Sequence, residues 1–200
     1  MIALVRGELH RAATIRSSWL SIAVLCVLTT LLGWLSVDFW KLLVGLGAFG
    51  LATAQTAQHY QHRTAVLLHL ARPDRLLVLA GQLVASVVVT VGFAAVSGVT
   101  VLVNGHVEHY RETLVVAPLM AVFAAASAAI FRRPTWLFLS FGVWFVLVEG
   151  LFGRLEKPLP FSAFLQAGVG DRLNLLIFAG WAALAVVGAV IAVRRDLVGE

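Results

Sequence analysis

Charged residues and cysteines are scarce in this chain of 200 residues. Asp, Glu, Lys and Arg together make up 12% of it, about half the share found in typical soluble domains. Hydrophobic residues make up 60% of the chain, so we expect residues 1–200 to form a single membrane domain without a separate soluble one. The lone cysteine, Cys26, excludes a disulfide within the chain.

Lysine is rarer still, and its neighbours exclude one class of function. The only two lysines, Lys41 and Lys157, precede Leu42 and Pro158. A P-loop needs G-x-x-x-x-G-K followed by Ser or Thr, so this chain cannot build one. The H-E-x-x-H motif of zinc proteases and the G-x-S-x-G elbow of hydrolases are also absent from the sequence. We therefore expect no enzyme activity in this chain, and any energy from ATP must come from a partner.

Long apolar runs are what the sequence does contain. A helix needs about 20 apolar residues to cross the hydrocarbon core of a bilayer, and six runs approach or exceed that length. The sequence therefore predicts an all-α membrane protein with six transmembrane helices. The predicted spans are Ser18–Ser36, Trp40–Ala57, Leu76–Val103, Thr113–Phe131, Trp136–Phe152 and Leu173–Val193. In the fourth span, closely spaced alanines predict tight contact with neighbouring helices: Ala121, Ala124, Ala125, Ala128 and Ala129.

The basic residues lie mainly on one side of the predicted spans. The net charge of +5 therefore indicates topology signals facing anionic lipid rather than nucleic-acid binding. One side of the spans holds ten arginines and the other holds five basic residues, which places both termini in the cytoplasm, with the first span as an uncleaved anchor. The ten are Arg6, Arg11, Arg16, Arg63, Arg72, Arg75, Arg132, Arg133, Arg194 and Arg195; the five are Lys41, Arg111, Arg154, Lys157 and Arg172.

Residues 1–16, before the first span, show helical periodicity. Ile2, Val5 and Leu9 recur on one face, whereas Arg6 and His10 lie on another. This pattern predicts an amphipathic helix in the cytoplasmic interface of the membrane. The alternative is a positively charged flank that happens to be helical.

Two of the connections between spans are long and partly apolar. In residues 58–75, Val66, Leu67 and Leu70 can form an apolar stripe, and Pro73 breaks any helix before the third span. We expect a short helix held against the cytoplasmic ends of the spans, where a soluble partner can contact it.

The connection formed by residues 153–172 is too apolar for a freely solvated loop. Its prolines and apolar residues are Pro158, Pro160, Phe161, Phe164 and Leu165. A short re-entrant helix between the fifth and sixth spans fits this composition, provided its backbone is buried against protein. The alternative is an interfacial loop anchored by Phe161 and Phe164.

Glu149 is the clearest acidic residue within a span. Intramembrane carboxylates often mark functional sites, but at this depth Glu149 can also reach the interface or pair with Arg154. Histidines offer a rival function, because His106 and His109 lie in the predicted polar connection Asn104–Glu112, and His59 and His62 are three residues apart. Such groups can ligate a metal or haem, which leaves a metal-binding or haem-binding membrane protein, or a membrane enzyme, as the alternative.

Three stretches resemble small six-span permease subunits of bacterial ABC exporters of the type-2 family. They are Leu4-Val5-Arg6-Gly7-Glu8-Leu9 with Arg16-Ser17-Ser18-Trp19-Leu20; Tyr60-Gln61-His62-Arg63-Thr64, Leu67-Leu68 and Arg72-Pro73-Asp74-Arg75 in the connection formed by residues 58–75; and Arg194-Arg195-Asp196-Leu197. The span number and topology match as well. The resemblance implies that the connection formed by residues 58–75 couples the permease to an ATPase. The residues implied in this coupling are His59, Tyr60, His62, Arg63, Thr64, Leu67, Leu68, Arg72, Pro73 and Arg75.

The resemblance also implies a location in the bacterial plasma membrane, and it implies partners. Such permeases pair with a second permease subunit, identical or different, and bind cytoplasmic ATPase subunits that carry ATP and magnesium. Re-entrant elements between their last two spans cap the exit path. Together with the aromatic spans, this leads us to expect export of a hydrophobic or amphipathic substrate such as a drug, an antibiotic or a lipid.

Overall fold

The computed structural model describes residues 2–61 and 74–195, and all regular structure within these ranges is helical. The elements are α1 (Ile2–Thr14), α2 (Arg16–Leu35), α3 (Val37–Gln61), α5 (Arg75–Ser97), α6 (Val99–Val103), α7 (Val107–Phe131), α8 (Pro134–Val143), the π-helix η1 (Trp144–Phe152), α9 (Pro160–Ala167) and α10 (Arg172–Arg195).

Six helical segments in the described part of the chain are long and apolar enough to cross a membrane. They are Ser18–Leu35, Val37–Ala57, Arg75–Ser97, Val107–Phe131, Pro134–Phe152 and Arg172–Arg195, with α8 and η1 forming the fifth together. The six predicted spans are confirmed, and the chain is a multi-pass membrane protein.

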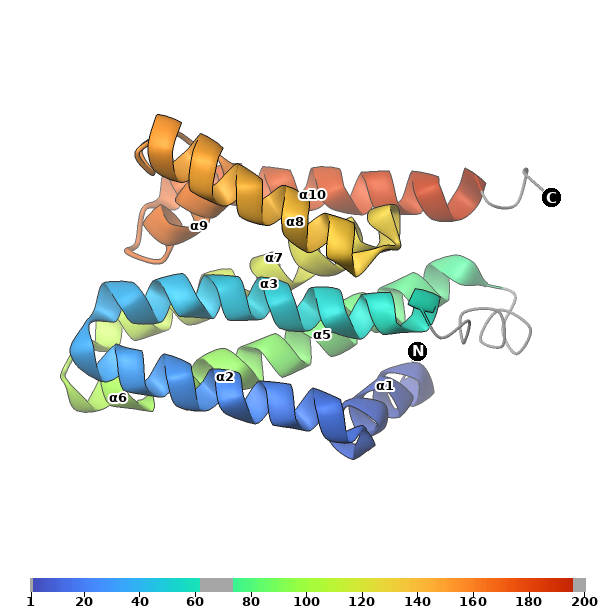
Figure 1. The fold of residues 1–200 in the computed structure, drawn as a ribbon, viewed down its shortest axis with the longest axis horizontal. Helices are drawn as coiled ribbons and strands as arrows, with labels where there is room; N and C mark the ends of the chain where they lie inside the picture. The colour runs from blue at the N-terminus through green and yellow to red at the C-terminus, as the bar shows by residue number, and fades with distance from the viewer. Residues whose placement is uncertain (1, 62–73, 196–200) are drawn as a thin grey trace.

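The long helices run side by side along one axis (Figure 1). Helix α1, the last turns of α3, the start of α5 and the last turn of α10 lie at one end of this bundle, called here the termini end. Helices α6 and α9 lie at the opposite end. Membrane-spanning helices that alternate in direction produce this arrangement, because each short connection returns the chain across the bundle.

Helix α7 is the centre of the bundle, where it packs against α3, α5 and α10. Of its span, 61% is buried, against 11% for each of the first and fifth spans. The predicted close packing is confirmed, because Ala121, Ala124, Ala125, Ala128 and Ala129 are all buried. Such small residues let helix backbones approach closely. Close packing of this kind holds helices together in a bilayer, where the hydrophobic effect does not act between them.

The boundaries of two predicted segments are corrected by the structure. The third apolar run is divided at Gly98 into α5 and α6, and a Cβ atom at this position would lie 2.5 Å from the Tyr110 ring and 2.6 Å from the Trp40 ring. Only glycine permits so close an approach of the stacked aromatic pair. The predicted connection Asn104–Glu112 is also too long, since α7 already begins at Val107 after a turn at Gly105.

The predicted amino-terminal helix is α1, and it is attached to the bundle by polar contacts. Arg11 donates from Nη2 to the backbone oxygen of Gln55 on α3 at 3.0 Å, and the same nitrogen lies 3.0 Å from the Glu8 carboxylate. The Leu4 side chain approaches α5 at Gly81, where a Cβ atom would be 3.3 Å from the Leu4 Cβ. The face of α1 that contacts the spans is therefore the one with Leu4, Glu8 and Arg11.

Candidate functional site

The fifth span changes its helical geometry part-way along its length. Helix α8 continues without a break into the π-helix η1, in which each backbone N–H bonds five residues back. In an α-helix, residues five apart point about 140° away from each other, because each residue turns the chain by about 100°. The π-helix instead brings Trp144 and Glu149 to the same side, and the Trp144 indole donates from Nε1 to Oε1 of Glu149 at 3.0 Å.

The Glu149 side chain is completely buried and accepts four hydrogen bonds. Besides Trp144, the donors are the backbone N–H of Phe161 at 3.2 Å, the backbone N–H of Ser162 at 2.6 Å and the Ser162 hydroxyl at 2.8 Å. Glu149 therefore neither reaches the interface nor bonds Arg154, the two structural alternatives that its position in the sequence left open. Its carboxylate joins the fifth span to the start of α9.

The start of α9 supplies backbone N–H donors to the Glu149 side chain. The first N–H groups of any helix lack partners within the helix, and the helix dipole makes this end favourable for negative charge. Pro160 at the first position has no N–H to satisfy, and Glu149 accepts from the next two residues. Glu149 thus caps α9 from a neighbouring span.

Helix α9 is held in the protein interior by two aromatic side chains. Phe161 and Phe164 are 2% and 1% exposed, and Phe164 packs edge-on against Phe178 of α10 with ring centroids 5.7 Å apart. A Cβ atom on Gly45 of α3 would lie 2.6 Å from the Phe164 ring, so glycine is needed at that contact. The predicted short helix is present, and its aromatic residues lie among helices rather than on an interfacial loop.

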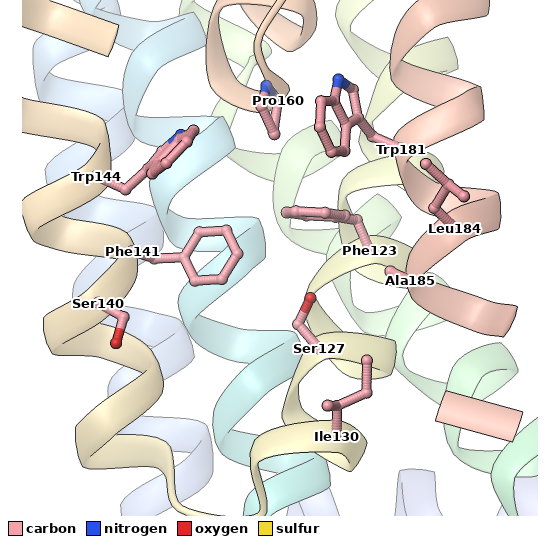
Figure 2. A pocket seen from close by; sticks show the side chains of 10 residues that line it. All are labelled: Phe123, Ser127, Ile130, Ser140, Phe141, Trp144, Pro160, Trp181, Leu184 and Ala185. Atoms are coloured by element: carbon pink, nitrogen blue, oxygen red, sulfur yellow. The ribbon is translucent and has the colours of Figure 1, made fainter. Parts of the chain in front are cut away.

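A cavity of about 420 Å³ lies between α7, the fifth span and α10, next to the start of α9. We call it the lateral cavity. Figure 2 shows the aromatic side chains of Phe141 and Trp144 on one side of it and those of Phe123 and Trp181 on the other, with Pro160 close to Trp181. The complete lining is Phe123, Ser127, Ile130, Ser140, Phe141, Trp144, Pro160, Trp181, Leu184 and Ala185.

The lining determines what kind of molecule the lateral cavity can bind. Its volume lies in the range of sites for small molecules, and its walls are aromatic and aliphatic apart from the hydroxyls of Ser127 and Ser140. It borders the Glu149 site, because Trp144 lines the cavity and bonds Glu149, and Pro160 precedes the two residues that Glu149 caps. The arrangement suits an apolar or amphipathic ligand.

Hydrogen bonds also tie α9 to the start of α10. The Asn174 amide nitrogen donates to Oε1 of Gln166 at 2.6 Å and to Oδ2 of Asp171 at 2.7 Å, and Gln166 donates from Nε2 to the Leu155 backbone oxygen at 2.9 Å. Oδ1 of Asp171 accepts from the backbone N–H of Leu173 at 2.9 Å, as a residue preceding a helix commonly does. The hydrogen bond from the Asn174 side chain, with those from the backbone N–H groups of Asn174 and Leu173, holds the pKa of Asp171 below its ordinary value.

Replacing Asp171 with alanine should lower the melting temperature of the detergent-purified protein at pH 7. Because the pKa of Asp171 is lowered in the folded state, its stabilising contribution is present above the unfolded pKa of about 3.9 and is lost as the pH falls through the folded pKa. The difference in melting temperature between wild type and variant should therefore narrow below about pH 4. Glu156→Ala, at an exposed position, is the control. A difference that does not depend on pH would contradict the role of the Asp171 charge.

The other predicted functional residues are placed only in part. His59 and Tyr60 belong to the last turn of α3, and Arg75 is the first residue of α5. The rest of the predicted coupling segment, His62, Arg63, Thr64, Leu67, Leu68, Arg72 and Pro73, lies outside the described residues. Pro158 is exposed before α9, and Leu165 is half-buried within it.

Two histidines of the rival function, His106 and His109, lie at the opposite end of the bundle from the termini, whereas His59 lies in the last turn of α3 and His62 lies outside the described residues. His106 directly precedes α7 and His109 lies in its first turn, with ring centroids 6.0 Å apart. Among the described residues, no group of three or more His, Cys, Asp or Glu side chains is arranged to hold a metal ion. The distance between the two rings alone does not favour a metal site.

Sequence reasoning missed the two features that define this site. Three of the four hydrogen bonds of Glu149 come from residues twelve and thirteen positions away, and the fourth depends on the π-helical turn between Trp144 and Glu149. The lateral cavity combines residues from three spans, so no local sequence pattern predicts it. Comparison with family models, with curated proteins and with solved structures gives no match for this chain.

Proposed function

We propose that this protein is the membrane-spanning subunit of an ATP-driven exporter and that it moves a hydrophobic or amphipathic molecule out of a bacterial cell. The observation that carries the proposal is the lateral cavity, which is apolar, lies within the membrane-spanning bundle and has the volume of a small-molecule site. A drug, an antibiotic or a lipid can place its apolar part against these aromatic and aliphatic walls.

The energy for transport would come from another chain. This sequence contains no P-loop, so a cytoplasmic ATPase subunit would bind ATP and magnesium. In this proposal both termini are cytoplasmic, and the connection formed by residues 58–75 contacts the ATPase. A second permease subunit, identical or different, would cover part of the exposed apolar surface of the first and fifth spans, of which 11% each is buried within the chain.

Helix α9 would be the re-entrant element at the outer end of the substrate path. Three contacts support this role: the Glu149 cap, the packing of Phe164 and the position of Pro160 beside the lateral cavity. Because α9 is attached both to the fifth span through Glu149 and to α10 through Asn174 and Phe178, a substrate that separates the fifth span from α10 would also displace α9 from one of them. The exit would then open as the cavity widens.

A cavity-filling substitution tests the proposed function. The tagged chain is purified from its native membranes with the ATPase that accompanies it and is reconstituted in vesicles, where ATP should drive a lipophilic fluorescent dye across the bilayer. Ala185→Phe places a ring in the lateral cavity and should reduce dye transport about tenfold, which corresponds to about 1.4 kcal/mol of lost binding.

Ala183→Phe is the matched control. Ala183 lies on the same helix but is exposed and does not line the cavity, so transport should stay within about twofold of wild type. An equal loss of dye transport in both variants would show that transport does not depend on the lateral cavity. Absence of ATP-dependent dye movement, and of an ATPase in every preparation, would contradict the exporter.

A further inference from the structure

A second apolar groove lies at the termini end, between α1 and α5. Its volume is about 720 Å³, and its lining consists of Ile2, Val5, Arg6, Leu9 and His10 on α1 with Val84 on α5. We call it the α1 groove. Because Leu4, Glu8 and Arg11 hold α1 against the bundle, Ile2, Val5 and Leu9 lie on a different face of the helix.

The apolar side of α1 is only partly covered by residues 2–61 and 74–195, the part of the chain that the structure describes. Ile2 is 86% exposed and Val84 is 37% exposed, whereas Val5 and Leu9 are half-buried. Only Ile15 separates α1 from α2, whose apolar span begins at Ser18. The α1 groove therefore lies at the level where a span begins, which is where lipid headgroups meet the hydrocarbon of a bilayer.

The edge of the groove carries positive charge. Arg6 and His10 are exposed and lie four residues apart, so their side chains are neighbours on the surface of α1. Glu8 is the one acidic residue in the sequence of α1, and its carboxylate pairs with Arg11 at 3.0 Å on the other side of the helix. The charge of Arg6 is therefore not neutralised by an acidic residue of its own helix.

We propose that the α1 groove is a binding site for an anionic phospholipid. An acyl chain lies along Ile2, Leu9 and Val84, and the lipid phosphate lies between Arg6 and His10. The apolar groove matches the acyl chain of such a lipid, and the basic edge matches its phosphate. An acyl chain alone or a phosphate alone would leave some of the lining residues without a contact. A basic residue next to a membrane surface favours anionic lipid, and here two donors converge on one headgroup.

Native mass spectrometry of the detergent-purified protein tests this site directly. With equimolar phosphatidylglycerol and phosphatidylcholine, the wild type should retain about five times more of the anionic lipid. The double variant Arg6→Gln with His10→Gln should retain the two lipids equally. Both positions are exposed, so the melting temperature of the variant should equal that of wild type.

Two controls separate a site from general attraction of charge. Arg194→Gln with Arg195→Gln also removes two basic residues at the termini end, from exposed positions that do not line the α1 groove, and should keep the fivefold preference. A tenfold excess of inorganic phosphate should not displace the lipid, because phosphate alone leaves the apolar groove unfilled.

Equal retention of the two lipids by wild type would overturn the proposal. So would an equal loss of preference in the two double variants, or displacement of the lipid by inorganic phosphate. The measurement needs neither an ATPase nor transport, and the α1 groove shares no residue with the lateral cavity. Its outcome is therefore independent of the exporter proposal.

Discussion

Replacing Glu149 with leucine should cost the protein roughly 3–5 kcal/mol of folding stability. Leucine is similar in size but accepts no hydrogen bond, so the indole N–H of Trp144, the Ser162 hydroxyl and the first free N–H groups of α9 would all lose their acceptor. These donors are buried among helices, where water does not replace a lost partner. The expected result is a large drop in melting temperature and in the yield of monodisperse protein.

Conservative variants show whether the hydrogen bonds are the cause. Glu149→Gln keeps one acceptor oxygen and should retain part of the stability, and Ser162→Ala, which removes one hydroxyl donor, should cost only about 1 kcal/mol. Glu156→Gln, at an exposed position, should change nothing measurable. If Glu149→Leu unfolds at the same temperature as wild type, the carboxylate does not hold α9.

Replacing Phe164 with alanine should cost about 3–5 kcal/mol, the usual range for a buried phenylalanine. Phe164 is 1% exposed and fits between Gly45 of α3 and Phe178 of α10, so its removal leaves a cavity beneath α9. Phe152→Ala is the control on the fifth span, because Phe152 is 74% exposed. Thermal unfolding in detergent gives both values.

A double-mutant cycle tests the contact between Gly45 and Phe164. Gly45→Ala should destabilise wild type by about 1–3 kcal/mol, since the added methyl group meets the Phe164 ring, and should cost less when Phe164 is already alanine. Gly50→Ala, on the same helix with nothing within 4 Å, serves as the control. Strict additivity of Gly45→Ala and Phe164→Ala would show that these two positions do not touch in solution.

The span pattern could be predicted from the sequence because it depends only on local hydrophobicity. A run of apolar residues long enough to cross a bilayer forms a helix whatever its neighbours are, since the backbone finds no other hydrogen-bond partners in lipid. The division at Gly98 escaped prediction, because it follows from the rings of Trp40 and Tyr110 that arrive from two other helices. The same limit applies to the lateral cavity.

The short helix between the last two spans was predicted from Pro158, Pro160 and the apolar residues that follow. Its partner Glu149 was noticed as an acid in a span, yet the π-helix that turns Glu149 toward α9 has no clear signature in residues 144–152. The proposed coupling role of Leu67 and its neighbours stays a prediction, since residues 62–73 lie outside the described chain.

One carboxylate oxygen at the edge of the lateral cavity accepts two hydrogen bonds. Oε1 of Glu149 accepts both from the Trp144 indole, which lines the cavity, and from the Phe161 backbone N–H at the start of α9. A ligand that pushes the indole aside changes the free energy of the helix cap, and by thermodynamic reciprocity a shift of α9 changes the affinity of the cavity by the same factor. Occupancy of the cavity by a ligand would therefore be linked to the position of α9 through the hydrogen-bonding capacity of a single atom.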